Sequence, residues 1–237
     1  MYVQPTLRPF SSAAELLISE ISYASAPNKG QGPKIAVIGA GITGVSAACQ
    51  ILEAGIECHL FEAGDEGSVG GIWTRQNSTS SLQIHSDFYQ FHPGVQWSCV
   101  YPDRREILQQ TRTLWDRFRL QDRATFHCPV NDIRRAGEKY IINDERYGTY
   151  DSIIVAIGTC SKLAVPKIPC QADYQGQVYH SSDLDNVDVL GKEVAIVGGG
   201  ASSLEAMEYA AQKGASSIKV ITRVLGSQQM PQRLHSS

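Results

Sequence analysis

Two glycine-rich turns in this chain of 237 residues have the composition and spacing of phosphate-binding turns. Residues 39–44 read Gly-Ala-Gly-Ile-Thr-Gly, and residues 198–203 read Gly-Gly-Gly-Ala-Ser-Ser. Glycines between a strand and a helix let the backbone approach a pyrophosphate, and the free N–H groups at the helix start then point at the phosphates. Each turn therefore predicts a dinucleotide site, with a purely structural turn as the alternative reading of the glycines alone.

The residues around the first turn predict the strand–helix–strand unit that such a site needs. Residues 34–38 form an apolar run typical of a buried parallel strand, and residues 42–54 predict an amphipathic helix that ends at Gly55. Residues 57–61 predict the next strand, which is followed by Glu62. A carboxylate at this place can accept hydrogen bonds from both hydroxyls of an unphosphorylated ribose, and it repels a 2′-phosphate.

The second turn has the same surroundings with the opposite charge at the end. Residues 193–197 predict a strand, residues 201–213 a helix, and residues 218–222 a second strand that leads to Arg223. A guanidinium can fork onto a 2′-phosphate, and two unit charges ~4 Å apart attract by about 4 kcal/mol near a protein surface. We therefore expect NADP here and a different adenine dinucleotide at the first turn, as in a flavoprotein that a nicotinamide cofactor reduces. The alternative is that Arg223 is a solvated strand end.

Composition and charge exclude several other classes of protein. The net charge is −3 without a basic run, which argues against nucleic-acid binding, and no apolar stretch approaches the ~20 residues of a membrane span. The six cysteines are scattered without a CxxC pair, so neither a zinc site nor a redox-active dithiol is predicted, and a reducing cytoplasmic location fits best. Cys49 and Cys58 fall inside predicted elements and are expected in the core.

The rest of the chain predicts elements that complete an α/β fold of the FAD/NAD(P)-binding Rossmann type. Residues 103–120 predict an exposed helix with one apolar face, and residues 152–158 predict a fully buried strand. A small antiparallel meander with a turn near Gly137 is predicted from four short runs at residues 125–128, 130–133, 139–143 and 146–150. The expected domains are a loose arm (1–33), an FAD-binding domain (34–164) and a partial NADP-binding domain (165–237).

Several further motifs occur in an order that resembles one enzyme family. Gly70-Gly71-Ile72-Trp73 is similar to the GGxW segment of the class B flavin-dependent monooxygenases, which include the flavin-containing monooxygenases and the Baeyer–Villiger enzymes. Residues 174–180, Tyr-Gln-Gly-Gln-Val-Tyr-His, resemble their identifying sequence FxGxxxH. Residues 156–159 resemble their ATG-like strand end, and residues 165–169 the link that follows it. The resemblance extends from about residue 34 to residue 223.

The resemblance implies a bound FAD that NADPH reduces by hydride transfer. Molecular oxygen then adds to the flavin, and the resulting C4a-(hydro)peroxyflavin inserts one oxygen atom into a small organic substrate, in specialised or secondary metabolism. The residues that the family would use for FAD are Gly39, Gly41, Ile42 and Gly44 at the pyrophosphate, Glu62 at the ribose, Gly71, Ile72 and Trp73 near the flavin, and Val130 at the adenine. Those for NADP are Gly198, Gly200, Ser202, Ser203 and Arg223.

Two residues are catalytic candidates through the same resemblance. Asn77 would lie near the flavin ring, and His180 would join the two domains and position the nicotinamide. The alternatives are a plain loop residue for Asn77, which also begins a formal glycosylation sequon, and an ordinary linker histidine for His180.

The chain also departs from the family pattern. Tyr174 replaces the family's phenylalanine, Leu184 replaces a usual aromatic residue, and the sequence ends soon after Arg223, where the family continues through further strands. We therefore expect a truncated form whose unpaired sheet edge promotes self-association. A non-catalytic FAD-binding remnant is one alternative. Another two-dinucleotide flavoprotein, such as a disulfide reductase, is a second, although the missing CxxC pair argues against it.

Overall fold

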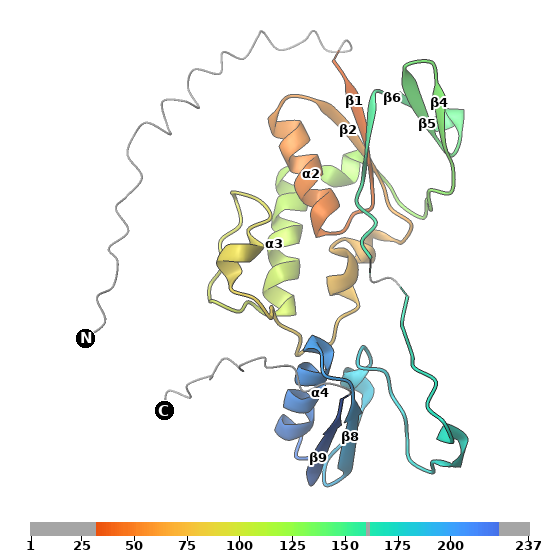
Figure 1. Ribbon diagram of the computed structural model, residues 1–237. Helices are drawn as coiled ribbons and strands as arrows, with labels where there is room; N and C mark the ends of the chain where they lie inside the picture. Colours follow the sequence, from red (N-terminus) through yellow and green to blue (C-terminus); the bar gives the residue numbers. More distant parts are fainter. Residues whose placement is uncertain (1–31, 160–161, 223–237) are drawn as a thin grey trace, which may run out of the picture.

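The computed structural model describes residues 32–159 and 162–222, which form two units (Figure 1). The first unit contains β1 (Lys34–Ile38), α2 (Ile42–Glu53), β2 (Glu57–Phe61), α3 (Arg104–Arg117), β3 (Ala124–Thr125), β4 (Ile133–Ala136), β5 (Lys139–Ile142), β6 (Thr149–Tyr150) and β7 (Ser152–Val155). The second contains β8 (Glu193–Val197), α4 (Ala201–Gln212) and β9 (Ser217–Ile221). The predicted α/β class and both strand–helix–strand units are confirmed.

The first unit has three layers around a parallel sheet with strand order β3-β2-β1-β7. Helices α2 and α3 cover one face, and the antiparallel sheet β4-β5-β6 covers the other (Figure 1). Alternate residues of β1 serve the two faces: Val37 belongs to the cluster that includes α2 and α3, whereas Ala36 and Ile38 pack with the antiparallel side. Burial on both faces explains why β1 reads as a continuous apolar run.

The second unit repeats the first at smaller scale. Strands β8 and β9 pair in parallel, and α4 covers one face of them. Helices α2 and α4 end in the same way, because Gly55 and Gly214 follow them with φ of +72° and +79°. Their N–H groups donate to Leu52 and Ala211, respectively, three residues earlier. A left-handed residue closes a helix at least cost when it is glycine, so both predicted helix ends are confirmed.

Two of the four runs predicted to form the meander differ from the prediction. Of the run predicted at residues 125–128, only Thr125 lies in a strand, β3. This strand joins the main parallel sheet through β2 and is not part of the meander, because the N–H of Glu62 donates to Thr125 at 2.9 Å and continues the β2–β3 ladder. The run predicted at residues 130–133 begins as a strand only at Ile133. The N–H groups of Asn131 and Asp132 instead donate to the side chain of Asn143.

The strand predicted over residues 152–158 is neither as long nor as buried as expected. It ends at Val155, which is 59% exposed, and Ile157 beyond it is 67% exposed. The physical reason is its place in the sheet, because β7 pairs only with β1 among the described strands and forms an edge. Self-association was predicted through the unpaired edge of the second unit, whose described sheet is β8-β9, and it stays a prediction.

Some predictions fall outside the described residues. These are most of the N-terminal arm, the polar tail after residue 223, and Arg223 itself. Among the described residues, none of the helices has the length and apolar character needed to cross a membrane.

Cys49 and Cys58 lie in the core as predicted, and burial raises the pKa of their thiols to about 12 and about 11. Only the thiolate is nucleophilic, so we expect iodoacetamide at pH 8 to label the exposed Cys99 and Cys170 well before these two. Peptide mass mapping over time checks this order, and urea should abolish it. Labelling of Cys49 in the folded protein at the rate of Cys170 would contradict the assigned core.

Candidate dinucleotide sites and the junction between them

The first glycine turn lies where β1 ends and α2 begins. Gly39 has φ +102°, and a Cβ on it would lie 2.6 Å from the carbonyl oxygen of Ala156, beyond the end of β7. A Cβ on Gly44 would lie only 1.9 Å from the carbonyl oxygen of Gly39. Helix α2 therefore packs directly on the turn, and both positions require glycine.

Gly41 faces the Gly70-Gly71 pair. The N–H of Gly70 donates to Ala40 at 3.0 Å, and a Cβ on Gly71 would lie 2.9 Å from the Cα of Gly41. Gly41 is the N-cap residue of α2, and no side chain caps that helix start. The first N–H groups of α2 are thus left available at the carboxyl end of β1, which is the place where dinucleotide pyrophosphates bind in such folds.

Glu62 closes the same turn from the end of β2. Its two carboxylate oxygens accept the N–H of Ala40 at 2.7 Å and that of Gly64 at 2.8 Å. Each oxygen keeps a further lone pair, so the carboxylate can still accept hydroxyl donors. Val130 lies close by, packed against the cluster that contains Phe61, the residue just before Glu62. The structure thus brings the predicted ribose and adenine residues to one end of the sheet.

Trp73 lies in the 3-10 helix Gly71–Thr74 and is held by two residues that sequence reasoning missed. Its indole N–H donates to the hydroxyl of Tyr89 at 2.8 Å. Burial raises the pKa of Tyr89 above its ordinary value, and this hydrogen bond offsets only part of the increase. The guanidinium of Arg104 donates to the carbonyl oxygens of Trp73 and Thr74 at 2.7 and 2.8 Å. Ile72 in the same turn is 42% exposed. Arg104 directly follows Asp103, whose side chain caps the start of α3, and this position is the signal by which the sequence could have indicated it.

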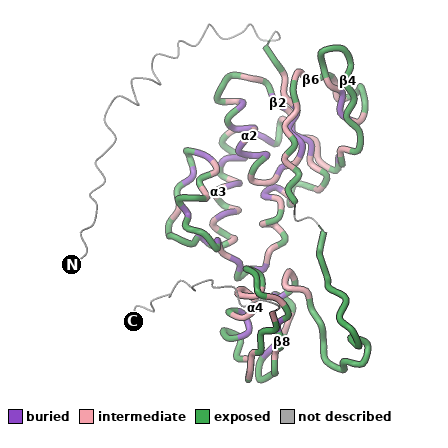
Figure 2. The backbone as a smooth tube through the Cα atoms, in the orientation of Figure 1, coloured by how far each residue is buried: buried purple, intermediate pink, exposed green. Residues whose placement is uncertain are grey.

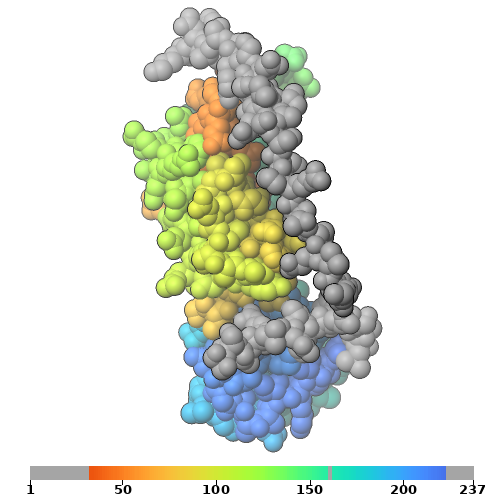
Figure 3. Space-filling model, turned by 90° about the vertical axis from the view of Figure 1, so that its left-hand side faces the viewer, coloured from red at the N-terminus to blue at the C-terminus, as the bar shows by residue number. Residues whose placement is uncertain are grey.

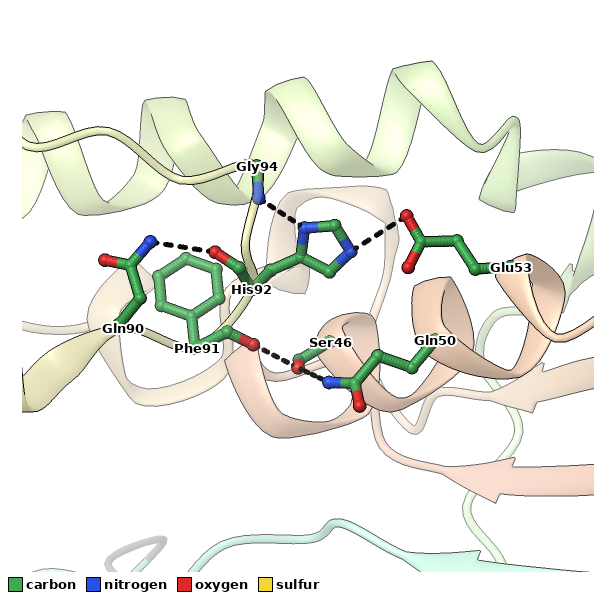
Figure 4. A network of polar contacts seen from close by, with 7 residues as sticks. All are labelled: Ser46, Gln50, Glu53, Gln90, Phe91, His92 and Gly94. Carbon is green, nitrogen blue, oxygen red and sulfur yellow. Dashed lines mark hydrogen bonds and ion pairs between the residues drawn. The ribbon is translucent and has the colours of Figure 1, made fainter. Parts of the chain in front are cut away.

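A polar network fixes the loop of residues 90–95 on the outer side of α2 (Figure 4). The hydroxyl of Ser46 donates to the carbonyl oxygen of Phe91, and the ring of His92 lies 3.5 Å from the carboxylate of Glu53. Nδ1 of His92 accepts the N–H of Gly94 at 2.9 Å. Ser46 and Glu53 are two turns apart on one side of α2, so this loop holds the helix whose start carries the glycine turn.

The second turn resembles the first but packs less tightly. Gly198 has φ +138°, and its N–H donates to Ile221 at 2.9 Å, as the N–H of Gly39 donates to Phe61. Gly200 is the uncapped N-cap residue of α4, and a Cβ on it would meet nothing within 4 Å.

The third position of this turn holds Ser203, whose hydroxyl donates to Gly200 at 2.7 Å. Ser202 is exposed beside it. The glycine backbone and the uncapped helix start of the predicted phosphate turn are therefore present, while Arg223 lies outside the described residues.

Asn77 lies at the junction of the two units and is 2% exposed. Its amide donates to the carbonyl oxygen of Ser181 at 2.8 Å and to the carboxylate of Glu205 at 3.2 Å, and its oxygen accepts the N–H of Leu184 at 2.9 Å. His180 is the residue directly before Ser181 in the sequence. The structure thus brings the two catalytic candidates into one region, and their roles in the reaction stay predictions.

His180 has its own local partner. Its Nδ1 accepts the N–H of Ser182 at 3.2 Å and lies 2.9 Å from the Ser182 hydroxyl. An Nδ1 that accepts leaves the other ring nitrogen, Nε2, to carry the proton of the neutral imidazole. Sequence reasoning missed two acids that contact the first unit: Asp185, which accepts the N–H of Ser78, and Glu205, which accepts the amide of Asn77. Nothing in their spacing distinguishes them from solvated surface acids.

Comparison with known proteins identifies the family. Residues 33–235 match the family model described as pyridine nucleotide-disulphide oxidoreductase. A Baeyer–Villiger monooxygenase of Pseudomonas aeruginosa is 26% identical over 180 residues, which is 73% of this chain and 34% of the relative. A Baeyer–Villiger monooxygenase of Streptomyces coelicolor is 30% identical over 181 residues, with the same two shares. The chain thus spans about a third of the length of these curated relatives.

Solved structures give the same result. The crystal structure of OTEMO in complex with FAD and NADP matches with a TM-score of 0.60 and 25% identity, over 80% of this chain and 39% of that one. Oxidised steroid monooxygenase bound to NADP matches with a TM-score of 0.62 and 25% identity, over 80% and 38%. The predicted resemblance to flavin-dependent monooxygenases is confirmed: the chain belongs to the pyridine nucleotide-disulphide oxidoreductase family, and Baeyer–Villiger monooxygenases are among its homologues.

Proposed function

We propose that the first unit binds FAD, that the second unit binds NADPH, and that the protein acts as a monooxygenase on a small organic substrate. The observation that carries this proposal is the match of 80% of the chain, with both units, to a structure that holds FAD and NADP together. Because the chain spans about a third of its curated relatives, the activity of the whole relatives is a proposal for it.

The residues of the first turn fit FAD. Gly41 offers a surface without a side chain beside the uncapped start of α2, so an anionic pyrophosphate would find free N–H donors and the positive end of the helix dipole. Glu62 presents acceptors toward the ribose side of this turn. Gly71 packs on Gly41, Trp73 lies in the same 3-10 helix as Gly71, and both would border the flavin.

FAD, when bound, supplies the redox chemistry: it takes a hydride from NADPH and activates O₂, so that one oxygen atom enters the substrate and the other leaves as water. The protein's own residues would bind and orient the two nucleotides. His180 would act on the nicotinamide side, and Asn77, whose three side-chain hydrogen bonds all cross the junction, would hold the two units in register.

The first test is the visible absorption spectrum of the purified protein, followed by anaerobic addition of NADPH. Flavin bands that bleach support both assignments. Bands that persist contradict the assignment of NADPH to the second unit and leave a flavin-binding protein. The absence of bands after reconstitution with FAD contradicts the assignment of FAD to the first unit. Substrate-dependent oxidation of NADPH then separates an enzyme from a non-catalytic FAD-binding protein.

Arg223 provides the test of cofactor preference. We expect Arg223→Ala to reduce the affinity for NADPH at least tenfold more than the affinity for NADH, because only NADPH carries the 2′-phosphate that a guanidinium can pair with. Titration of both cofactors by quenching of flavin fluorescence measures this ratio. Arg119→Ala, which removes an exposed guanidinium from the first unit, is the control. Equal loss of NADPH and NADH would contradict the assignment.

A disulfide reductase is the second candidate, because the family model carries that name. The sequence has no CxxC pair to serve as the dithiol, so the monooxygenase is favoured. We propose a cytoplasmic location from the same cysteine pattern, since scattered thiols suit a reducing compartment.

A further inference from the structure

The covalent connection between the two units does not hold them in position. Residues 162–179 are all exposed and run as an extended arm beside the molecule (Figures 1 and 2). The arm contains one short 3-10 helix, Gln171–Asp173. An exposed segment of this kind permits many relative orientations, so the orientation in the structure must come from contacts elsewhere.

Hydrogen bonds between the described parts of the two units lie where residues 77–80 meet the second unit. In the space-filling view, orange-yellow atoms of the first unit rest on blue atoms of the second (Figure 3). The N–H and hydroxyl of Ser78 donate to the carboxylate of Asp185 at 2.9 and 2.7 Å. The hydroxyl of Ser80 donates to the carboxylate of Glu205, which also accepts the amide of Asn77. We call these five residues the junction.

The first-unit side of the junction is rigidly attached to the glycine turn. The carbonyl oxygen of Ser80 accepts the N–H of Arg104 at 2.8 Å, and the guanidinium of Arg104 holds the carbonyls of Trp73 and Thr74. The 3-10 helix that contains Trp73 begins at Gly71, which packs on Gly41. Residues 70–80 therefore connect the first turn to the junction without a free segment.

The second-unit side is equally firm. Asp185 follows Leu184, which is 8% exposed and belongs to the core of the second unit. Glu205 lies on α4, about one helical turn after the uncapped helix start at Gly200. Glu205 and Asp185 are thus both fixed to the unit that contains the glycine turn proposed to hold NADPH.

We propose that Asp185 and Glu205 are positioning residues, whose carboxylates hold the nicotinamide unit in register with the flavin unit through Ser78, Ser80 and Asn77. The statement about nicotinamide and flavin rests on the proposed function, whereas the holding of the two units does not. Hydride transfer needs the donor and acceptor atoms about 3–3.5 Å apart, so a loosened junction slows transfer even when both nucleotides bind.

The test is the double variant Asp185→Ala/Glu205→Ala, compared with the charge-matched control Asp173→Ala/Glu193→Ala. Asp173 lies in the exposed arm and Glu193 is exposed at the start of β8. Small-angle X-ray scattering should show a larger radius of gyration and a broader distance distribution for the junction variant alone. This readout needs no cofactor, so it remains informative if the proposed function fails.

Anaerobic stopped-flow reduction of the flavin by saturating NADPH is the second readout. The junction variant should be reduced at least tenfold more slowly, with flavin content and NADPH affinity within about twofold of the control. When glutamine replaces Glu205 in place of alanine (Glu205→Gln), an acceptor remains at this position, and most of the rate of flavin reduction should be retained. Ser78→Ala/Ser80→Ala removes the two hydroxyl donors from the opposite side and leaves the N–H of Ser78 and the amide of Asn77 in place. This variant should show the same kind of defect at a smaller size, and it provides the test if the acidic variant does not fold. Scattering curves and reduction rates equal to those of the control would overturn the proposal.

Discussion

The variant Gly41→Val is expected to be a folded protein that purifies without flavin. Gly41 has φ −69°, which any residue can adopt, and a Cβ there would lie at an ordinary contact distance of 3.6 Å from the Cα of Gly71. The protein can therefore accept a side chain at the cost of a poorer helix start, about 1 kcal/mol. The pyrophosphate cannot, because the branched side chain would occupy the surface beside the first N–H groups of α2.

We expect FAD affinity to fall at least 100-fold, which corresponds to about 2.8 kcal/mol. The ratio of flavin absorbance to protein absorbance, measured after reconstitution with excess FAD, gives the result, and far-ultraviolet circular dichroism verifies the fold. Gly55→Ala is the matched control, since Gly55 has a positive φ and lies at the far end of the same helix. Stoichiometric flavin in Gly41→Val would show that the first unit is misassigned.

The variant Gly44→Ala should lose the fold of the first unit itself. A methyl group on Gly44 would lie 1.9 Å from the carbonyl oxygen and 3.0 Å from the carbonyl carbon of Gly39. Both are backbone atoms, so no side-chain rotation relieves the clash, and α2 would have to leave the turn. The hydrogen bond from the N–H of Val45 to Gly41, now 2.9 Å, would break with it. We expect a loss on the order of 4 kcal/mol or more, which is most of the stability of a typical domain.

The internal repeat supplies the control for this prediction. Ser203 is the counterpart of Gly44 in the second unit and already carries a Cβ. Ser203→Ala removes one hydrogen bond to Gly200 and should cost only about 1 kcal/mol. Urea unfolding followed by circular dichroism compares the two variants. If Gly44→Ala unfolds at the same urea concentration as Ser203→Ala, the close packing of α2 on its turn is wrong.

Both strand–helix–strand units could be predicted because their signals are local. The apolar run 34–38, the glycines at 39 and 44 and the closing Gly55 each satisfy a steric or hydrogen-bonding demand within a few residues of themselves. The same is true of residues 193–214. Such demands are present in the amino-acid types and their spacing, so no distant partner was needed to find them.

The predictions were wrong where a short segment could pair with more than one strand. Residues 124–125 can form a strand in either sheet. They extend the parallel sheet because they pair with the free edge of β2. The exposure of Val155 likewise depends on which strands lie beyond β7, a property of the sheet and not of the run itself.

The sequence by itself determined the two strand–helix–strand units, their glycine turns and the order of the motifs, because backbone sterics and hydrophobic periodicity act over short distances. Only the tertiary structure decided how the units face each other. Asn77 meets Ser181 and Glu205 across separations of 104 and 128 residues, and no local pattern at any of the three encodes the contact. A buried polar side chain needs hydrogen-bond partners, and at a contact between two units the tertiary structure determines which residues these are. The local sequence therefore does not identify them.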